Sequence, residues 1–270
     1  MSEPVVSVKN VVKTFGGGKG FFSKKPLVHA INGVSFDIMP GETFGLVGES
    51  GCGKSTTGRL IDHLLSSDSG EIWFDRKDIT KLTENEMRPV RADIQMIFQD
   101  PYGSLNPRRR ISDLIAEPLL IHTDMSERER QKEVNDLLRV VGLSPAHGER
   151  YPHEFSGGQR QRIGIARALT VHPKLIIADE PVSALDVSIQ AQVLNLMSKL
   201  QKDYNLTYLF ISHDLSVVEM IADRIAVMYL GTIVETASKK ELFEHPRHPY
   251  TRALLSAVPI PDPTKKSDRI

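Results

Sequence analysis

The sequence predicts an α/β fold built around a parallel sheet, and three features of the chain predict it. Thr43 to Val47 reads as a short buried strand that leads through a glycine-rich turn into a helix from about Gly53 to Leu65. Over residues 174–229 apolar strands alternate with helices, and such alternation builds a parallel sheet covered by helices. Two strand patterns, Val5 to Phe15 and Val28 to Ile38, add an antiparallel flank at the N-terminus.

The other elements follow the same reasoning. Glu71 to Phe74 and Ile94 to Phe98 are expected as strands, and prolines and helical patterns then predict an inserted helical lobe. Its expected helices are Ile111 to Ala116, Ser126 to Val141 and Gly157 to Val171, with Pro101, Pro107, Pro118, Pro145 and Pro152 as breaks. The later elements are strand Leu175 to Ala178, helix Ser188 to Asp203, strand Leu206 to Ser212, helix Leu215 to Ala222 and strand Arg224 to Tyr229. Gly16 to Leu27 is expected as a surface loop, two short helices are expected after Ile233, and the proline- and charge-rich end of the chain should fray.

Composition excludes several classes of protein. Lys plus Arg and Asp plus Glu both number 34 in 270 residues, so the chain has no overall positive field for nucleic acid. Cys52 is the sole cysteine, which excludes a disulfide within the chain and fits a reducing compartment. No apolar run approaches the ~20 residues that span a bilayer. We therefore expect a cytoplasmic protein that other chains hold at a membrane if it works there.

Residues 48–55, Gly-Glu-Ser-Gly-Cys-Gly-Lys-Ser, match the phosphate-binding loop pattern G-x-x-x-x-G-K-[ST] between a strand and a helix. Glycines let backbone N–H groups surround a phosphate at the positive end of a helix dipole. Lys54 should contact the β/γ oxygens, and the Ser55 hydroxyl should bind Mg²⁺. The predicted ATP-binding residues of this loop are Gly48, Ser50, Gly51, Cys52, Gly53, Lys54, Ser55 and Thr56.

Residues 175–180, Leu-Ile-Ile-Ala-Asp-Glu, form an apolar strand that ends in two acids. A P-loop ATPase places its Mg²⁺-binding carboxylate and the base for the attacking water there. We assign Asp179 to the metal and Glu180 to catalysis, against the simpler interpretation of an acidic turn.

Phe155-Ser-Gly-Gly-Gln159 leads into a helix that is rich in arginine. A serine N-cap followed by two glycines offers a hydroxyl and an uncovered helix end to an anion. This second phosphate site has no use within one isolated P-loop subunit. We therefore include Ser156, Gly157, Gly158 and Gln159 among the ATP-binding residues.

At this point the chain closely resembles the ABC transporter ATPase family over nearly its whole length. In that family the segment at residues 155–159 closes on ATP held by the opposite subunit. Gln99 matches the Q-loop glutamine, which also helps bind the metal, and Asp186 ends the D-loop Ser-Ala-Leu-Asp. His213 matches the switch histidine, and Phe15 matches the aromatic residue that stacks on adenine. The resemblance implies a RecA-like P-loop core with ATP and Mg²⁺ as cofactors and Glu180, His213 and Gln99 as catalytic residues.

Two longer segments resemble the oligopeptide/dipeptide importer branch, whose relatives include nickel importers. They are Gln99-Asp-Pro-Tyr-Gly-Ser-Leu-Asn-Pro-Arg and His245-Pro-Arg-His-Pro-Tyr-Thr-Arg-Ala-Leu. Arg108 to Arg110 form a basic run that fits either a solvated loop or contact with a membrane subunit.

The resemblance implies an ATPase subunit that powers peptide uptake, located at the cytoplasmic face of the membrane. Its implied partners are transmembrane permeases, a second ATPase subunit of the same or a similar kind and, indirectly, an extracytoplasmic solute-binding protein, with no nucleic acid. We expect residues 1–98 and 172–236 to form the ATPase core, 99–171 the helical subdomain and 237–270 a C-terminal extension.

Three alternatives stand beside this interpretation. A nickel or other small-solute importer would use the same ATPase. A soluble ABC ATPase acting on DNA or ribosomes would need a coiled-coil insertion or a second cassette, and a phosphotransferase would leave the second phosphate site unexplained.

Overall fold

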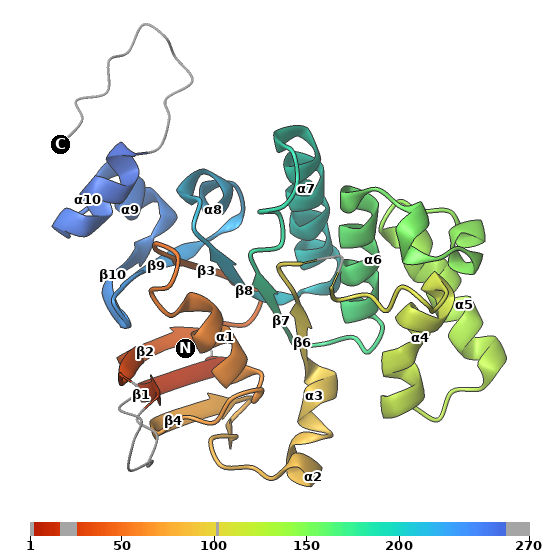
Figure 1. Ribbon diagram of the computed structural model, residues 1–270, viewed down its shortest axis with the longest axis horizontal. Helices are drawn as coiled ribbons and strands as arrows, with labels where there is room; N and C mark the ends of the chain where they lie inside the picture. The colour runs from red at the N-terminus through yellow and green to blue at the C-terminus, as the bar shows by residue number, and fades with distance from the viewer. Residues whose placement is uncertain (1–2, 17–25, 101–102, 258–270) are drawn as a thin grey trace, which may run out of the picture. The chain divides into compact units, whose positions relative to one another are not determined.

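The computed structural model describes residues 3–16, 26–100 and 103–257 (Figure 1). Residues 17–25 of the predicted loop Gly16 to Leu27 lie outside these ranges, as do Pro101 and the chain end beyond residue 257 that was predicted to fray. The chain divides into two compact units, which are unit 1 (Met1–Leu82 and Leu209–Ile270) and unit 2 (Thr83–Tyr208). The expected three-part division of the chain stays a prediction.

Unit 1 contains an antiparallel sheet in the order β2-β1-β4-β5. Its strands are β1 (Val6–Phe15), β2 (Val28–Ile38), β4 (Ser69–Phe74) and β5 (Lys77–Asp78). Along β1 the pairing with β2 shifts register at three places, and the apolar side chains of Val6, Val8 and Val11 remain buried. The predicted antiparallel flank is confirmed.

A second group of strands in unit 1 is mixed. β3 (Thr43–Val47) runs parallel to β9 (Arg224–Tyr229), and β9 pairs antiparallel with β10 (Thr232–Ser238). All five residues of β3 are buried, because strands covered on both faces have no polar side. The helices of unit 1 are α1 (Lys54–Ile61), α8 (Leu215–Ile221), α9 (Lys239–Glu244) and α10 (Pro249–Ser256).

The sequence pattern does not predict strand β10. It predicts short helices directly after Ile233. Leu230 and Gly231 form the two-residue connection from β9, and both have positive φ, 45° and 81°. A two-residue hairpin of type I′ requires this geometry at both positions, and Asn or Asp usually occupies the first. Leucine there gives no turn signal, so the hairpin was not predicted.

Unit 2 combines a parallel strand pair with helices. β6 (Ile94–Ile97) pairs with β7 (Leu175–Asp179), and the carbonyl of Asp93 accepts from the N–H of Lys174 at 2.9 Å. The helices are α2 (Glu84–Met87), α3 (Val90–Asp93), α4 (Ile111–His122), α5 (Glu127–Val140), α6 (Gly157–Leu169) and α7 (Val187–Tyr204), with 3₁₀ turns at Pro145–Glu149 and Pro152–Glu154. Strand β8 (Thr207–Ser212) spans the residues at which the two units divide.

Helix α4 continues through Pro118, at which the sequence predicted a break. Proline removes one helical hydrogen bond, which disfavours the helix interior. Here Leu114, Ile115 and Leu119 are buried on either side of the proline. Tertiary packing of this apolar face therefore outweighs the local preference.

Candidate functional site

The predicted phosphate loop lies between β3 and α1, in the strand, loop and helix order that the pattern requires. Gly48 has a φ of 151°, and a Cβ added there would lie 2.2 Å from the carbonyl oxygen of Met228. Gly53 has a φ of 113°, and its added Cβ would lie 2.4 Å from the carbonyl oxygen of Ala30. Only glycine fits both the conformation and the close backbone approach.

Lys54 begins helix α1 and is 4% exposed. Its Nζ donates to the carbonyl oxygens of Gly48 at 2.7 Å and Glu49 at 2.8 Å. The N-cap of α1 is Gly53, which has no side chain to cap the first turn of the helix. The ammonium and the helix end together suit a phosphate group.

Cys52 is buried in the loop, where its backbone carbonyl accepts from the N–H of Gly231 at 3.0 Å. Burial raises the pKa of the Cys52 thiol, and the nearby Lys54 ammonium offsets only part of that effect. The thiol is therefore neutral near pH 7.

The two acids lie at the end of β7 as predicted. Asp179 is 3% exposed and is the last residue of the strand. Glu180 follows with a φ of 48°, a left-handed conformation that is uncommon outside glycine. The Nε2 of Gln99 donates to Oε2 of Glu180 at 2.9 Å, although 81 residues separate them. Unit 2 thus brings together two of the predicted catalytic residues.

The segment at residues 156–159 forms the N-terminus of α6. The Ser156 side chain accepts from the N–H of Gln159 at 3.3 Å, and the Gln159 side chain accepts from the N–H of Ser156 at 3.1 Å. This reciprocal capping box fixes the first turn. Ser156 itself is exposed, so its hydroxyl is accessible from outside unit 2.

Gly158 has a packing role that the sequence did not reveal. A Cβ added to Gly158 would lie 2.4 Å from Cγ2 of Ile189 in α7. The glycine therefore lets α6 and α7 approach closely. Its motif alone suggested only an uncovered helix end.

Asp186, the last residue of the D-loop, is the N-cap of α7. Its carboxylate accepts from the Ser188 hydroxyl at 2.8 Å and from the N–H of Ile189 at 3.1 Å. These hydrogen bonds lower the pKa of Asp186. The residue thus has a structural role besides the predicted contact with nucleotide.

His213 and Phe15 lie in unit 1. His213 is exposed between β8 and α8, and Phe15 ends β1 with 40% of its surface exposed. The Nζ of Lys13 lies 5.6 Å from the centre of the Phe15 ring. Stacking of this ring on adenine stays a prediction.

The basic run at Arg108 to Arg110 is largely engaged within unit 2. Arg109 Nη1 lies 2.5 Å from Glu117 of α4, and Glu117 also pairs with Arg167 of α6 at 2.8 Å. Arg110 pairs with Glu149. Arg108 remains exposed, so of the three it best fits contact with another chain. Tyr102, predicted beside this run, lies outside the described residues.

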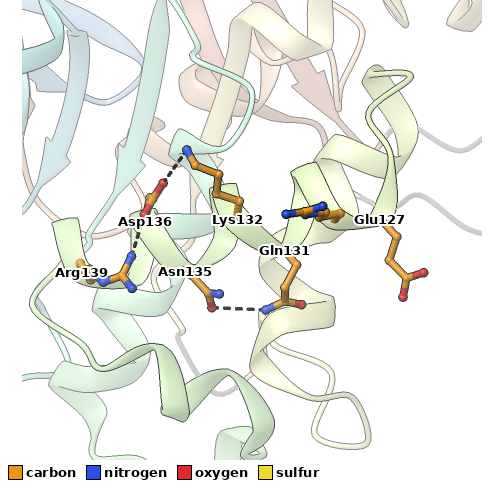
Figure 2. A pocket seen from close by; sticks show the side chains of 7 residues that line it. Glu127, Gln131, Lys132, Asn135, Asp136 and Arg139 are labelled. Atoms are coloured by element: carbon orange, nitrogen blue, oxygen red, sulfur yellow. Dashed lines mark hydrogen bonds and ion pairs between the residues drawn. The ribbon is translucent and has the colours of Figure 1, made fainter.

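A shallow hollow runs along the outer face of α5 (Figure 2). Within it the Asp136 carboxylate bridges Lys132 at 3.2 Å and Arg139 at 2.7 Å. None of the predicted nucleotide residues lines it. It is not part of the candidate site.

No helix in the part of the chain that the structure describes is long and apolar enough to cross a membrane.

Comparison with known proteins agrees with the geometry. The profile of the ABC transporter family matches residues 31–183, and that of the "Oligopeptide/dipeptide transporter, C-terminal region" matches residues 234–270. The oligopeptide transport ATP-binding protein AppF of Bacillus subtilis (strain 168) is 57% identical over 96% of this chain and 79% of its own length. Its relative OppF from the same strain is 54% identical over 100% of this chain and 87% of its own length.

A glutathione import ATP-binding protein, GsiA of Pectobacterium atrosepticum, is 54% identical over 98% of this chain but only 43% of its own length. Among solved structures, the dimeric ATP-binding cassette MJ0796 in a post-hydrolysis state with ADP and Pi has a TM-score of 0.77 at 30% identity. That match covers 87% of this chain and 98% of the cassette, which confirms the expected RecA-like α/β core. The chain therefore belongs to the ABC transporter family, as one of its ATP-binding and ATP-hydrolysing subunits.

Proposed function

We propose that this chain drives the uptake of peptides through partner permeases, by hydrolysing MgATP together with a second ATPase subunit. The observation that supports the peptide assignment is the match of residues 234–270 to the oligopeptide/dipeptide transporter region. The names of AppF and OppF, which are similar along nearly all of this chain, point the same way.

In this proposal the loop from Gly48 to Thr56 holds the phosphates of ATP. The Lys54 ammonium, buried beside the loop carbonyls, neutralises the β/γ oxygens when nucleotide binds. The Ser55 hydroxyl and the carboxylate of Asp179 would hold Mg²⁺, with Gln99 as a further oxygen ligand. These hard oxygen donors fit that ion, which binds few protein ligands and keeps phosphate and water oxygens. Mg²⁺ would supply positive charge against the charge on the transferring phosphoryl group.

Glu180 is proposed as the base that orients the attacking water. Its carboxylate is held by the Gln99 amide at 2.9 Å, so a change at Gln99 would move the base. His213 is proposed to contact the γ-phosphate, as the family resemblance implies. Catalysis in this class of reaction depends mostly on positioning and electrostatic stabilisation.

Ser156 to Gln159, with Asp186, are proposed to act on ATP held by the partner ATPase subunit. The exposed Ser156 and the ordered first turn of α6 support this role. Through the permeases the subunit would lie at the cytoplasmic face of the membrane, and an extracytoplasmic solute-binding protein would deliver the peptide.

Uptake of labelled peptides tests the proposal in cells that lack this chain. Re-expression of the wild-type chain should restore uptake of tripeptides to pentapeptides, whereas Lys54→Ala should not, because it removes the phosphate-binding charge. Uptake of nickel should be the same in all three strains. Restoration of nickel uptake without any peptide uptake would contradict the peptide assignment and favour the nickel alternative.

A further inference from the structure

The C-terminal part of unit 1 returns to the phosphate loop. Helices α9 and α10 follow β10, and α9 packs against that strand (Figure 1). Tyr250 is the second residue of α10, and its hydroxyl oxygen accepts from the N–H of Glu49 at 3.1 Å. Glu49 is the second residue of the phosphate loop. A contact thus joins the region typical of this transporter branch to the nucleotide loop.

Several contacts fix Tyr250 in place. The N–H of Tyr250 donates to Nδ1 of His248 at 3.2 Å, which caps the start of α10. The carboxylate of Glu235 in β10 accepts from the N–H groups of Arg247 at 2.8 Å and His248 at 3.0 Å. The Tyr250 ring packs on that of Tyr229, with ring centres 4.4 Å apart and a tilt of 41°.

The peptide bond that Tyr250 contacts also holds the P-loop lysine. The N–H of Glu49 and the carbonyl of Gly48 belong to one planar peptide group. Tyr250 accepts from its N–H, and Lys54 Nζ donates to its carbonyl oxygen at 2.7 Å. Because the group is rigid, a change of orientation at one end moves the other. Hydrogen bonds in such a series also polarise one another.

Tyr250 is well suited to this position at neutral pH. Burial raises the pKa of Tyr250, so the hydroxyl stays protonated and the oxygen stays a neutral acceptor. On the other side of the loop the backbone of β9 approaches Gly48 closely, since the carbonyl oxygen of Met228 lies 2.2 Å from the position that a Cβ at Gly48 would take. The loop is therefore braced from β9 and from α10.

We infer that Tyr250 is a positioning residue for nucleotide binding, whose hydroxyl orients the Gly48–Glu49 peptide and, through it, the Lys54 ammonium. The inference rests on the proposed role of the loop in phosphate binding. It gives the C-terminal region of the chain a function in setting the affinity for ATP.

Tyr250→Phe tests whether the Tyr250 hydroxyl positions the loop, a role called the brace below, since it removes the hydroxyl and keeps the ring on Tyr229. One neutral hydrogen bond is lost, so affinity of the full chain for a fluorescent ATP analogue with Mg²⁺ should fall roughly threefold to tenfold. In the assembled importer the KM for ATP should rise by the same factor, with kcat at saturating ATP within about twofold of wild type. Tyr204→Phe, at an exposed tyrosine that ends α7, is the matched control and should change neither value.

A second variant acts from a distance. Glu235→Ala removes the acceptor for two N–H groups ahead of α10 and should weaken nucleotide binding in the same direction, although it does not touch the loop. Lys54→Ala distinguishes a wrong role for Tyr250 from a wrong assignment of the phosphate site. If Lys54→Ala abolishes binding while Tyr250→Phe binds ATP like wild type, the brace is wrong and the phosphate site stands. If Lys54→Ala also binds normally, the phosphate site itself is wrong. A fall in kcat with unchanged KM, or equal loss in the Tyr204→Phe control, would also overturn the brace.

Discussion

Gly158→Ala should destabilise unit 2 even though alanine favours helices. The added Cβ would lie 2.4 Å from Cγ2 of Ile189, whereas carbon atoms in contact are separated by about 3.5–4.0 Å. Overpacking of this kind costs roughly 1–3 kcal/mol, and the gain in helix propensity offsets up to about 1 kcal/mol. The net loss is therefore about 0–3 kcal/mol. Each kcal/mol lost lowers the Tm by roughly 2–4 °C in a chain of this size.

Thermal unfolding of the full chain measures this effect in a double-mutant cycle. Ile189→Ala removes the clashing branch, so the two substitutions together should cost about 1–3 kcal/mol less than the sum of the single changes. Gly164→Ala is the matched control in the same helix, because nothing lies within 4 Å of a Cβ added there. We expect it to be neutral or slightly stabilising. Additive effects in the cycle, or Gly158→Ala behaving like Gly164→Ala, would refute the packing argument. If adding Ile189→Ala to Gly158→Ala raises the Tm again while the ATPase activity of the double variant stays low, Gly158 also has the proposed role at the partner's phosphate.

Three further predictions follow from the site. Glu180→Gln keeps an oxygen that can accept from Gln99, but the amide cannot act as a base. MgATP should therefore bind and hold two subunits together without turnover. Light scattering that shows only monomers at saturating MgATP would contradict this. Ser156→Asp should keep the Tm within about 2 °C, since aspartate caps helices well, yet should abolish ATP-dependent association, and a variant that still associates would exclude the contact. The raised pKa of Cys52 favours the neutral thiol in the folded chain, so its contribution to stability is complete below the unfolded pKa near 9.0 and is lost as pH rises through the higher folded pKa. Cys52→Ala should therefore lose less stability than wild type as pH rises above 9.0 in urea titrations, and identical losses would count against the burial argument.

The elements that could be predicted from the sequence are those with strong periodicity. The apolar run of β3 and the glycine pattern after it require no distant partner to be recognised. Helix α4 extends past Pro118 because buried neighbours decide its end, and no local rule contains that information. Leu230 at a positive φ similarly hid the hairpin that precedes β10.

Candidate residues could be assigned to the site, but their connections could not. Gln99 and Glu180 are 81 residues apart, and Glu49 and Tyr250 are 201 apart, so spacing in the chain gives no sign of either hydrogen bond. The basic run shows the reverse problem. Three consecutive arginines fit either a solvated loop or contact with a membrane subunit, while Arg109 is paired with Glu117 in α4. Charge alone did not distinguish an internal ion pair from a docking surface.

The choice of serine at position 156 shows how one residue serves two requirements. The helix end of α6 needs an acceptor for the Gln159 N–H, and Asp or Asn would cap it as well as Ser. A proposed contact with phosphate adds a second requirement, because the same side chain must then donate to an anion. A hydroxyl has two acceptor lone pairs and one proton. The capping hydrogen bond uses one lone pair and leaves the proton for the phosphate, so cap and ligand do not compete. A carboxylate would satisfy the cap but repel the phosphate, and an alanine could neither cap the helix nor donate to the phosphate.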